Sequence, residues 1–77
     1  MHVSLAMQKD LFLKKLGNRI KELRGEQNMS QTDLAHKCGK DSQSLERVEN
    51  GKTNPSAYYL MEISKALKIP LKDLFDF

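Results

Sequence analysis

Cysteine is nearly absent from this chain of 77 residues, which contains only Cys38. A single thiol cannot form an internal disulfide, so we expect a reducing, cytoplasmic environment. His2 and His36 are the only histidines, and neither has the sequence spacing to Cys38 that a zinc site or an activated nucleophile requires. We therefore expect no metal, no cofactor and no enzymatic activity.

Long apolar runs are also missing. No segment approaches the roughly 18 consecutive apolar residues of a membrane span, and the start of the chain has no charged and then apolar pattern typical of a secretory signal. Lysine and arginine total 13 against 10 acidic residues, a net charge of +3. This mild excess permits a polyanionic partner without requiring one. We expect one domain over residues 1–77, in which residues 1–8 form a flexible extension.

Apolar residues recur at helical spacing along most of the chain. Leu13, Leu16, Ile20 and Leu23 are three or four residues apart and share one face of a helix predicted from about residue 9 to 27. Further helical segments are predicted at about 30–38, 42–50, 56–67 and 70–75. Their signals are N-caps at Ser30, Asp41 and Ser56, a capping box of Ser30 with Asp33, and the stop signals that follow. Alternation with a period of two is absent, so no strand is expected. The sequence predicts an all-α, compact bundle of five helices.

The segment around Gly39 indicates a helix-turn-helix. Two predicted helices are joined there by a very short turn, which favours a residue that tolerates positive φ. Ala35, a small residue four positions earlier, allows the second helix to cross the first at close range. Leu45 and Val48 can close the angle from beneath. In this motif the second helix enters the major groove of DNA.

An ordered set of residues extends this pattern and resembles the phage-repressor and Cro-type helix-turn-helix proteins, the Xre family. The resemblance runs from Leu16 to about Leu74 and implies a lambda-repressor-like DNA-binding domain. The matching residues are Ile20, Leu23-Arg24, Ser30-Gln31, Leu34-Ala35, Gly39, Ser44-Leu45, Glu49-Asn50-Gly51-Lys52, Asn54-Pro55-Ser56, Ile63 and Ala66-Leu67.

The resemblance implies that Ser42, Gln43 and Arg47 point at base edges. The spacing of Gln43 and Arg47 supports this assignment, because residues four apart share a helix face, here the one opposite Leu45 and Val48. Their chemistry also fits, since Gln can pair bidentately with adenine and Arg with guanine.

Phosphate contacts are implied at the edges of the same motif. Gln31 would bind a phosphate and brace the second helix, and Lys52 would act with backbone N–H groups near Asn50 and Thr53. Lys40 departs from the family, which usually has an apolar residue after the turn glycine. Its stem can pack along the core while its ammonium reaches solvent or a phosphate.

A salt bridge between Arg24 and Glu49 is implied as a structural link between the first and third helices. If the pair is buried, removing one partner costs about 3–5 kcal/mol, and if it is exposed the cost falls below about 1 kcal/mol.

The implied function is that of a prokaryotic or phage transcriptional regulator, expected to repress by binding a palindromic operator in double-stranded DNA. The apolar C-terminal segment either closes the core or forms a two-fold contact, and we expect a homodimer through it. Three alternatives stay open: a restriction–modification controller, an antitoxin with a toxin protein partner, and a protein-interaction module of the same fold. The residues of that segment are Leu71, Leu74, Phe75 and Phe77.

Overall fold

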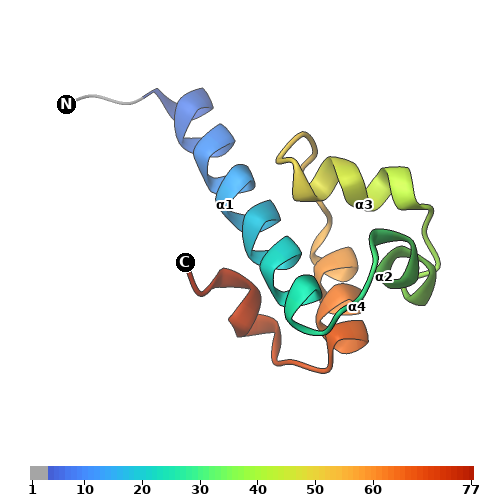
Figure 1. The fold of residues 1–77 in the computed structure, drawn as a ribbon. Coiled ribbons are helices and arrows are strands. Elements are labelled where there is room, and N and C mark those ends of the chain that lie inside the picture. Colours follow the sequence, from blue (N-terminus) through green and yellow to red (C-terminus); the bar gives the residue numbers. More distant parts are fainter. Residues whose placement is uncertain (1–3) are drawn as a thin grey trace.

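The computed structural model describes residues 4–77, which contain helices and no strand (Figure 1). The elements are α1 (Leu5–Glu26), α2 (Gln31–Lys37), α3 (Ser42–Glu49), α4 (Ala57–Leu67) and the 3₁₀ helix η1 (Leu71–Phe75). The prediction of five helices was therefore wrong in its last member, because five residues after Pro70 form a tighter 3₁₀ segment. Of the expected flexible extension, residues 1–3 lie outside the described part, and residues 5–8 belong to α1.

Side-chain caps start all four α-helices. A serine or aspartate at each N-cap accepts a hydrogen bond from the backbone N–H three residues later, which satisfies one of the free donors of the first turn. Ser30 and Asp33 form the reciprocal capping box that the sequence predicts. The caps are Ser4, Ser30, Asp41 and Ser56.

Left-handed residues end the same four helices and keep the connections short. Asn28, Gly39, Gly51 and Lys68 have φ values of 55°, 67°, 70° and 59°. After α2, the N–H of the residue following Gly39 donates to the Ala35 carbonyl at 2.9 Å, which closes the turn. The α2–α3 turn at Gly39 thus has the geometry that the motif requires.

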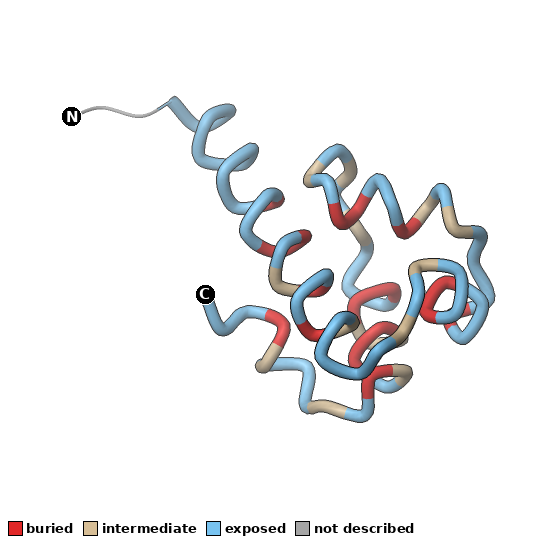
Figure 2. The backbone as a smooth tube through the Cα atoms, viewed as in Figure 1, coloured by how far each residue is buried: buried red, intermediate tan, exposed pale blue. Residues whose placement is uncertain are grey.

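One apolar core joins the elements, and Figure 2 shows its buried positions along the inner side of each helix. The predicted stripes of α1 and α4 supply much of it, while α2 and α3 supply the rest. The cluster comprises Leu16, Ile20, Leu23, Leu34, Ala35, Cys38, Leu45, Val48, Tyr59, Leu60, Ile63, Leu67 and Leu74. The first turns of α1 lie outside this core and are exposed.

Backbone contact fixes how α1 crosses α3. A Cβ atom added at Gly17 would lie 2.4 Å from the Glu49 carbonyl oxygen and 2.5 Å from that of Val48. No side chain fits there, so the glycine lets α1 touch the last turn of α3 directly. Without this contact, a glycine inside a helix would only lower its stability, by about 1 kcal/mol relative to alanine.

The C-terminal segment is partly buried and partly exposed. Leu74 is fully buried and closes the core, whereas Leu71, Phe75 and Phe77 are exposed. The Arg19 Nε–H donates to the Asp73 carbonyl at 2.9 Å, which ties η1 to α1. Within residues 4–77 no helix is long and apolar enough to cross a membrane.

Candidate nucleic-acid interface

Helix α3 has one buried and one exposed face. Leu45, Val48 and Glu49 are at most 2% exposed and anchor the helix, while Gln43 and Arg47 are exposed on the other side. The two exposed side chains are one turn apart. The structure therefore places both predicted base readers on the outer face of a helix whose other face is held in the core.

Two shallow hollows flank this outer face and share Gln43 and Arg47 as a common ridge. The first, of about 490 Å³, lies toward the start of α4 and is lined by Lys40, Asp41, Gln43, Ser44, Arg47, Val48, Thr53, Pro55, Ser56 and Tyr59. The second, of about 390 Å³, lies toward the end of α3 and is lined by Gln43, Glu46, Arg47, Asn50 and Lys52. A ridge between hollows is a shape that can enter a groove.

The other predicted DNA contacts surround this ridge. Ser42, the first residue of α3, is half-buried. Asn50 and Lys52 are exposed in the second hollow, and Thr53 lines the first. The Asn50 N–H already donates to the Glu46 carbonyl at 3.0 Å, so this residue can offer a phosphate only its side chain. The structure therefore brings Asn50, Lys52 and Thr53 to the hollows beside the ridge, whereas Ser42 lines neither hollow.

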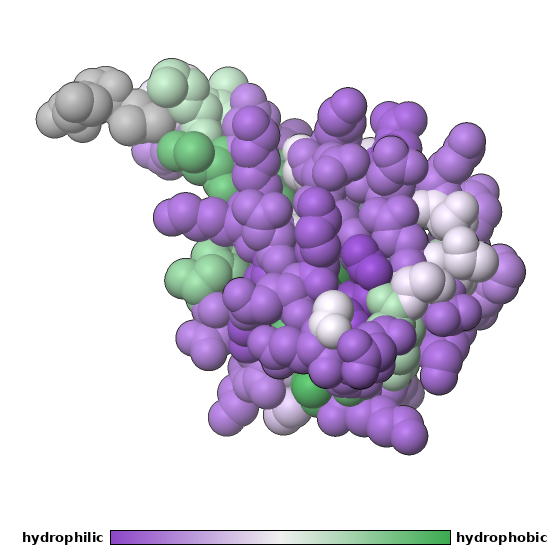
Figure 3. Space-filling view, viewed as in Figure 1, coloured by the Kyte–Doolittle hydropathy of each residue, from purple (hydrophilic) through white to green (hydrophobic). Residues whose placement is uncertain are grey.

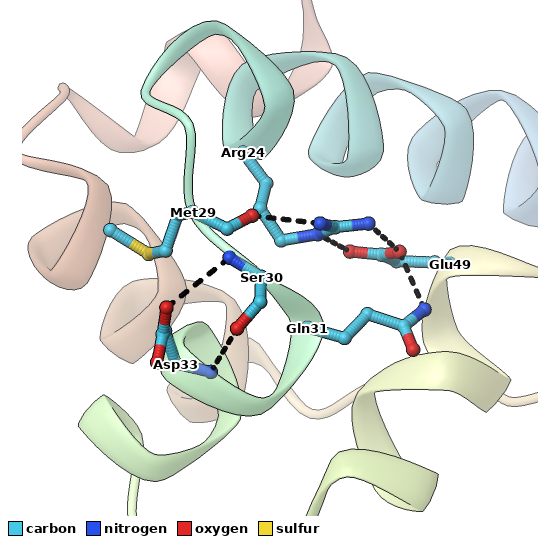
Figure 4. Close-up of polar contacts among 6 residues, drawn as sticks. All are labelled: Arg24, Met29, Ser30, Gln31, Asp33 and Glu49. Atoms are coloured by element: carbon cyan, nitrogen blue, oxygen red, sulfur yellow. Dashed lines mark hydrogen bonds and ion pairs between the residues drawn. The ribbon is translucent and has the colours of Figure 1, made fainter.

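A buried carboxylate holds the end of α3 in place (Figure 4). The Glu49 side chain is 0% exposed and accepts hydrogen bonds from Arg24 Nε at 2.8 Å and Arg24 Nη2 at 3.0 Å. The third guanidinium nitrogen is also hydrogen-bonded: Arg24 Nη1 donates to the Met29 carbonyl at 2.8 Å. The hydrogen bond to Glu49 raises the pKa of Arg24. The implied salt bridge is thus a bidentate pair with one fully buried partner.

Gln31 connects α2 to the same carboxylate. Its Nε2 donates to Glu49 Oε1 at 2.9 Å, as Figure 4 shows. An amide nitrogen carries two hydrogens, so the second remains for another acceptor. The brace that the resemblance implied for Gln31 therefore runs through Glu49, from the first turn of α2 to the last turn of α3.

The unusual Lys40 has a structural partner in Tyr59. Its ammonium lies 5.3 Å from the centre of the Tyr59 ring, a distance at which a cation and an aromatic face attract each other. Tyr59 is 6% exposed, and burial raises the pKa of its hydroxyl. The Lys40 side chain thus lies against a buried ring, and Lys40 also lines the first hollow.

Two residues of this surface were not singled out in the sequence. Tyr59 was only one of a tyrosine pair, and Glu46 had no partner to mark it. Glu46 is exposed in the second hollow beside Gln43 and Asn50. The sequence signal for Glu46 was its place in α3 directly before Arg47, with which it lines the second hollow.

The described residues were also compared with the requirements of a metal site and of a thiol nucleophile. No group of three or more His, Cys, Asp or Glu side chains in residues 4–77 is arranged to hold a metal ion. Cys38 is buried, and burial raises the pKa of its thiol, which is the opposite of what a nucleophile needs.

Comparison with known proteins identifies relatives of this arrangement. The control protein C.BamHI of Bacillus amyloliquefaciens is 37% identical over 62 residues, which are 79% of this chain and 76% of that protein. An uncharacterized HTH-type transcriptional regulator of Methanocaldococcus jannaschii, MJ0272, is 34% identical over 75% of this chain and 88% of its own. The crystal structure of the restriction-modification controller protein C.AhdI from Aeromonas hydrophila matches with a TM-score of 0.80 and 36% identity, over 82% of this chain and 96% of that one.

The match to a protein family covers most of the domain. Residues 20–74, from the middle of α1 to η1, match the family HTH_3, described as helix-turn-helix. This range contains the turn at Gly39, the buried Glu49 network and the exposed ridge of α3. The chain belongs to the HTH_3 helix-turn-helix family of DNA-binding transcriptional regulators.

Proposed function

We propose that the protein is a transcriptional repressor that binds a palindromic operator as a homodimer, with α3 in the major groove. The observation that carries this proposal is the ridge of Gln43 and Arg47, which stands between two hollows on a helix anchored by buried side chains. In this position Gln43 pairs with adenine and Arg47 with guanine, while Ser42 contacts the edge of a neighbouring base.

Phosphate binding supplies the remaining affinity. Lys52 and the Asn50 side chain face one strand, and Lys40 and Thr53, at the rim of the first hollow, face a backbone phosphate on the other side of the ridge. The second hydrogen of the Gln31 amide serves a phosphate at the start of α2. These contacts fix the register of the protein and make the affinity depend on salt.

The homodimer follows from the need to read two half-sites. Leu71, Phe75 and Phe77 are exposed and lie in the C-terminal segment, which contacts α1 and α4 rather than α3. A two-fold contact there leaves both copies of α3 free and places them about 34 Å apart, one turn of DNA.

A role in the control of a restriction–modification system is the favoured biological setting. The similarity to C.BamHI extends over 76% of that protein and the similarity to C.AhdI over 96% of its chain, so the match includes about three quarters of the first relative and nearly all of the second. An antitoxin role, or a protein-interaction role without DNA, has no comparable support.

Binding titrations with operator variants test the DNA interface. Fluorescence anisotropy with sites selected from a random oligonucleotide pool gives the affinity for each base at each position. We expect Arg47→Ala to lose about 1–3 kcal/mol at one base pair of each half-site and to relax specificity there. Lys52→Ala is expected to weaken all sequences alike and to reduce the salt slope by about one unit per half-site.

Lys65→Ala is the matched control, because Lys65 is exposed on α4 and lines neither hollow flanking α3. It should leave affinity nearly unchanged. A uniform loss of affinity with Arg47→Ala, equal at every base pair, would show that Arg47 is a phosphate contact and not a reader.

A further inference from the structure

Glu46 is a charged residue beside the α3 ridge that the base contacts proposed above do not use. It is exposed and lines the second hollow together with Gln43, Arg47, Asn50 and Lys52. Gln43 precedes it by three residues and Asn50 follows it by four, a spacing that brings side chains to one side of a helix. Glu46 therefore lies on the surface that would enter a groove.

The Glu46 carboxylate has no partner within residues 4–77. Its side chain forms no ion pair or hydrogen bond there, although Arg47 and Lys52 line the same hollow. Glu49, the other glutamate of α3, is the opposite case, because its carboxylate is buried and accepts three hydrogen bonds. The Glu46 carboxylate is thus available to accept a hydrogen bond from a molecule outside the chain.

The surface over α3 is suited to a polar partner. Figure 3 shows mainly hydrophilic residues there, whereas the apolar surface in this view gathers over the first turns of α1. A carboxylate placed among polar side chains loses its hydration when a partner covers it, and this loss is unfavourable unless the partner supplies a hydrogen-bond donor. The partner must therefore present a donor at the position of Glu46.

The chemistry of base edges limits which donor a carboxylate can meet in the major groove. A carboxylate only accepts hydrogen bonds. Guanine and thymine present acceptors there, whereas cytosine presents its N4 amino group and adenine its N6 amino group. The adenine amino group lies beside the acceptor N7, a pair that an amide matches better than a carboxylate does. A carboxylate in the groove therefore favours cytosine.

We propose that Glu46 is a further specificity-determining residue, whose carboxylate accepts a hydrogen bond from the N4 amino group of one cytosine in each half-site. The inference rests on the proposed entry of α3 into the major groove. Glu46 and Arg47 are consecutive, so they are about 1.5 Å apart along the helix axis, less than the roughly 3.4 Å between base pairs. The cytosine therefore belongs to the base pair that Arg47 reads or to the adjacent one.

Glu46 also discriminates by repulsion. At a half-site without this cytosine, the carboxylate faces base acceptors and nearby phosphates with no donor to compensate for its lost hydration. Incorrect sequences and random-sequence DNA are therefore bound more weakly because Glu46 is present. This sets Glu46 apart from Lys52, whose removal weakens binding to every sequence.

Anisotropy titrations with variants of the selected operator test this role. Glu46→Ala should lose at least about fivefold of the preference for cytosine over thymine at one position of each half-site. It should also bind a random-sequence duplex more tightly, because a negative charge leaves the interface. Glu46 is exposed and lies outside the core, so the change should not unfold the domain.

Asp10→Ala is the matched control for the change in charge. Asp10 is exposed on α1 and lines neither hollow flanking α3. Its removal raises the net charge by the same amount as Glu46→Ala, so any effect of net charge alone appears in both variants. We expect Asp10→Ala to leave every base preference unchanged and to strengthen binding to random-sequence DNA less than Glu46→Ala does.

A base analogue tests the hydrogen bond itself. Replacing the cytosine by 2-pyrimidinone removes the N4 amino group and thus the proposed donor. The unaltered protein should lose about fivefold or more in affinity, and Glu46→Ala about twofold or less. The same replacement at a cytosine outside the half-sites should affect both proteins equally.

Equal losses in the two proteins at the half-site cytosine would contradict the proposal. So would selected operators without a preferred cytosine near the guanine that Arg47 reads, or base preferences that Glu46→Ala leaves unchanged. Arg47→Ala, titrated on the same duplexes, separates this inference from the proposed function. If Arg47→Ala relaxes specificity and Glu46→Ala does not, only the role of Glu46 is wrong. If neither variant changes any base preference, the proposed reading of DNA by α3 is wrong as well.

Discussion

Removal of the Arg24 side chain is the change that most directly probes how α3 is held. In Arg24→Ala the Glu49 carboxylate loses two hydrogen bonds, of 2.8 and 3.0 Å, and its one positive partner among residues 4–77. It keeps one hydrogen bond, from Gln31 at 2.9 Å. The Met29 carbonyl loses its Arg24 donor as well. Because the Glu49 side chain is 0% exposed, water cannot replace what is lost without opening the core.

The expected cost follows from that burial. Breaking a buried pair by deleting one partner typically costs about 3–5 kcal/mol, because the other charge is stranded. A domain of 77 residues has a free energy of unfolding of about 4–12 kcal/mol. Arg24→Ala should therefore lower the melting temperature by about 12 °C or more, and at the lower end of the stability range it should unfold the protein.

Urea denaturation followed by circular dichroism at 222 nm measures this cost. Lys21→Ala, an exposed position on the same helix, is the control and should change the free energy of unfolding by less than about 0.5 kcal/mol. Arg24→Leu combined with Glu49→Met removes both charges and should recover at least half of the loss. A cost below about 1 kcal/mol for Arg24→Ala is typical of an exposed pair and would refute the buried network.

Three further experiments test the packing. Gly17→Ala should destabilise the domain by about 1–3 kcal/mol in the same urea assay, because its Cβ would meet the Glu49 carbonyl at 2.4 Å. Gly25→Ala is the control, because a Cβ there has nothing within 4 Å, and it should be neutral or stabilising by up to about 1 kcal/mol. Equal effects of the two substitutions would contradict the α1–α3 contact. Lys68→Gly should stabilise by about 1 kcal/mol, since Lys68 has a φ of 59°, and a loss of stability would show that its side chain matters more than its backbone. Cys38 should react with a thiol reagent far more slowly in the folded protein than in urea, because burial raises its pKa and blocks access, and equal rates would place it at the surface.

Helix caps and turns could be predicted from the sequence, because they depend on side chains that interact with neighbouring backbone groups. The caps at Ser30, Asp41 and Ser56 and the turn at Gly39 were predicted, and the structure has all four. Such features depend on a few consecutive residues, so a single sequence contains them. The positions of Gln43 and Arg47 on the outer face of α3 followed from helical periodicity in the same way.

Features that depend on distant residues were not predictable. Periodicity indicated that α1 begins near residue 9, because its earlier apolar residues have no core to face, yet Ser4 caps a helix that starts at Leu5. The role of Gly17 depends on carbonyl groups about thirty residues further along the chain. Likewise, the contact between Lys40 and the Tyr59 ring forms only in the folded chain, since the two residues are far apart in the sequence.

The central claim is that the exposed face of α3 is the surface that meets DNA. Nuclear magnetic resonance titration of ¹⁵N-labelled protein with a short random-sequence duplex tests it directly, since non-specific binding uses the same phosphate contacts. We expect the largest amide shifts between Ser42 and Thr53 and at Gln31, with little change in η1. Shifts centred on the first turns of α1 and on η1, with α3 unchanged, would contradict this claim.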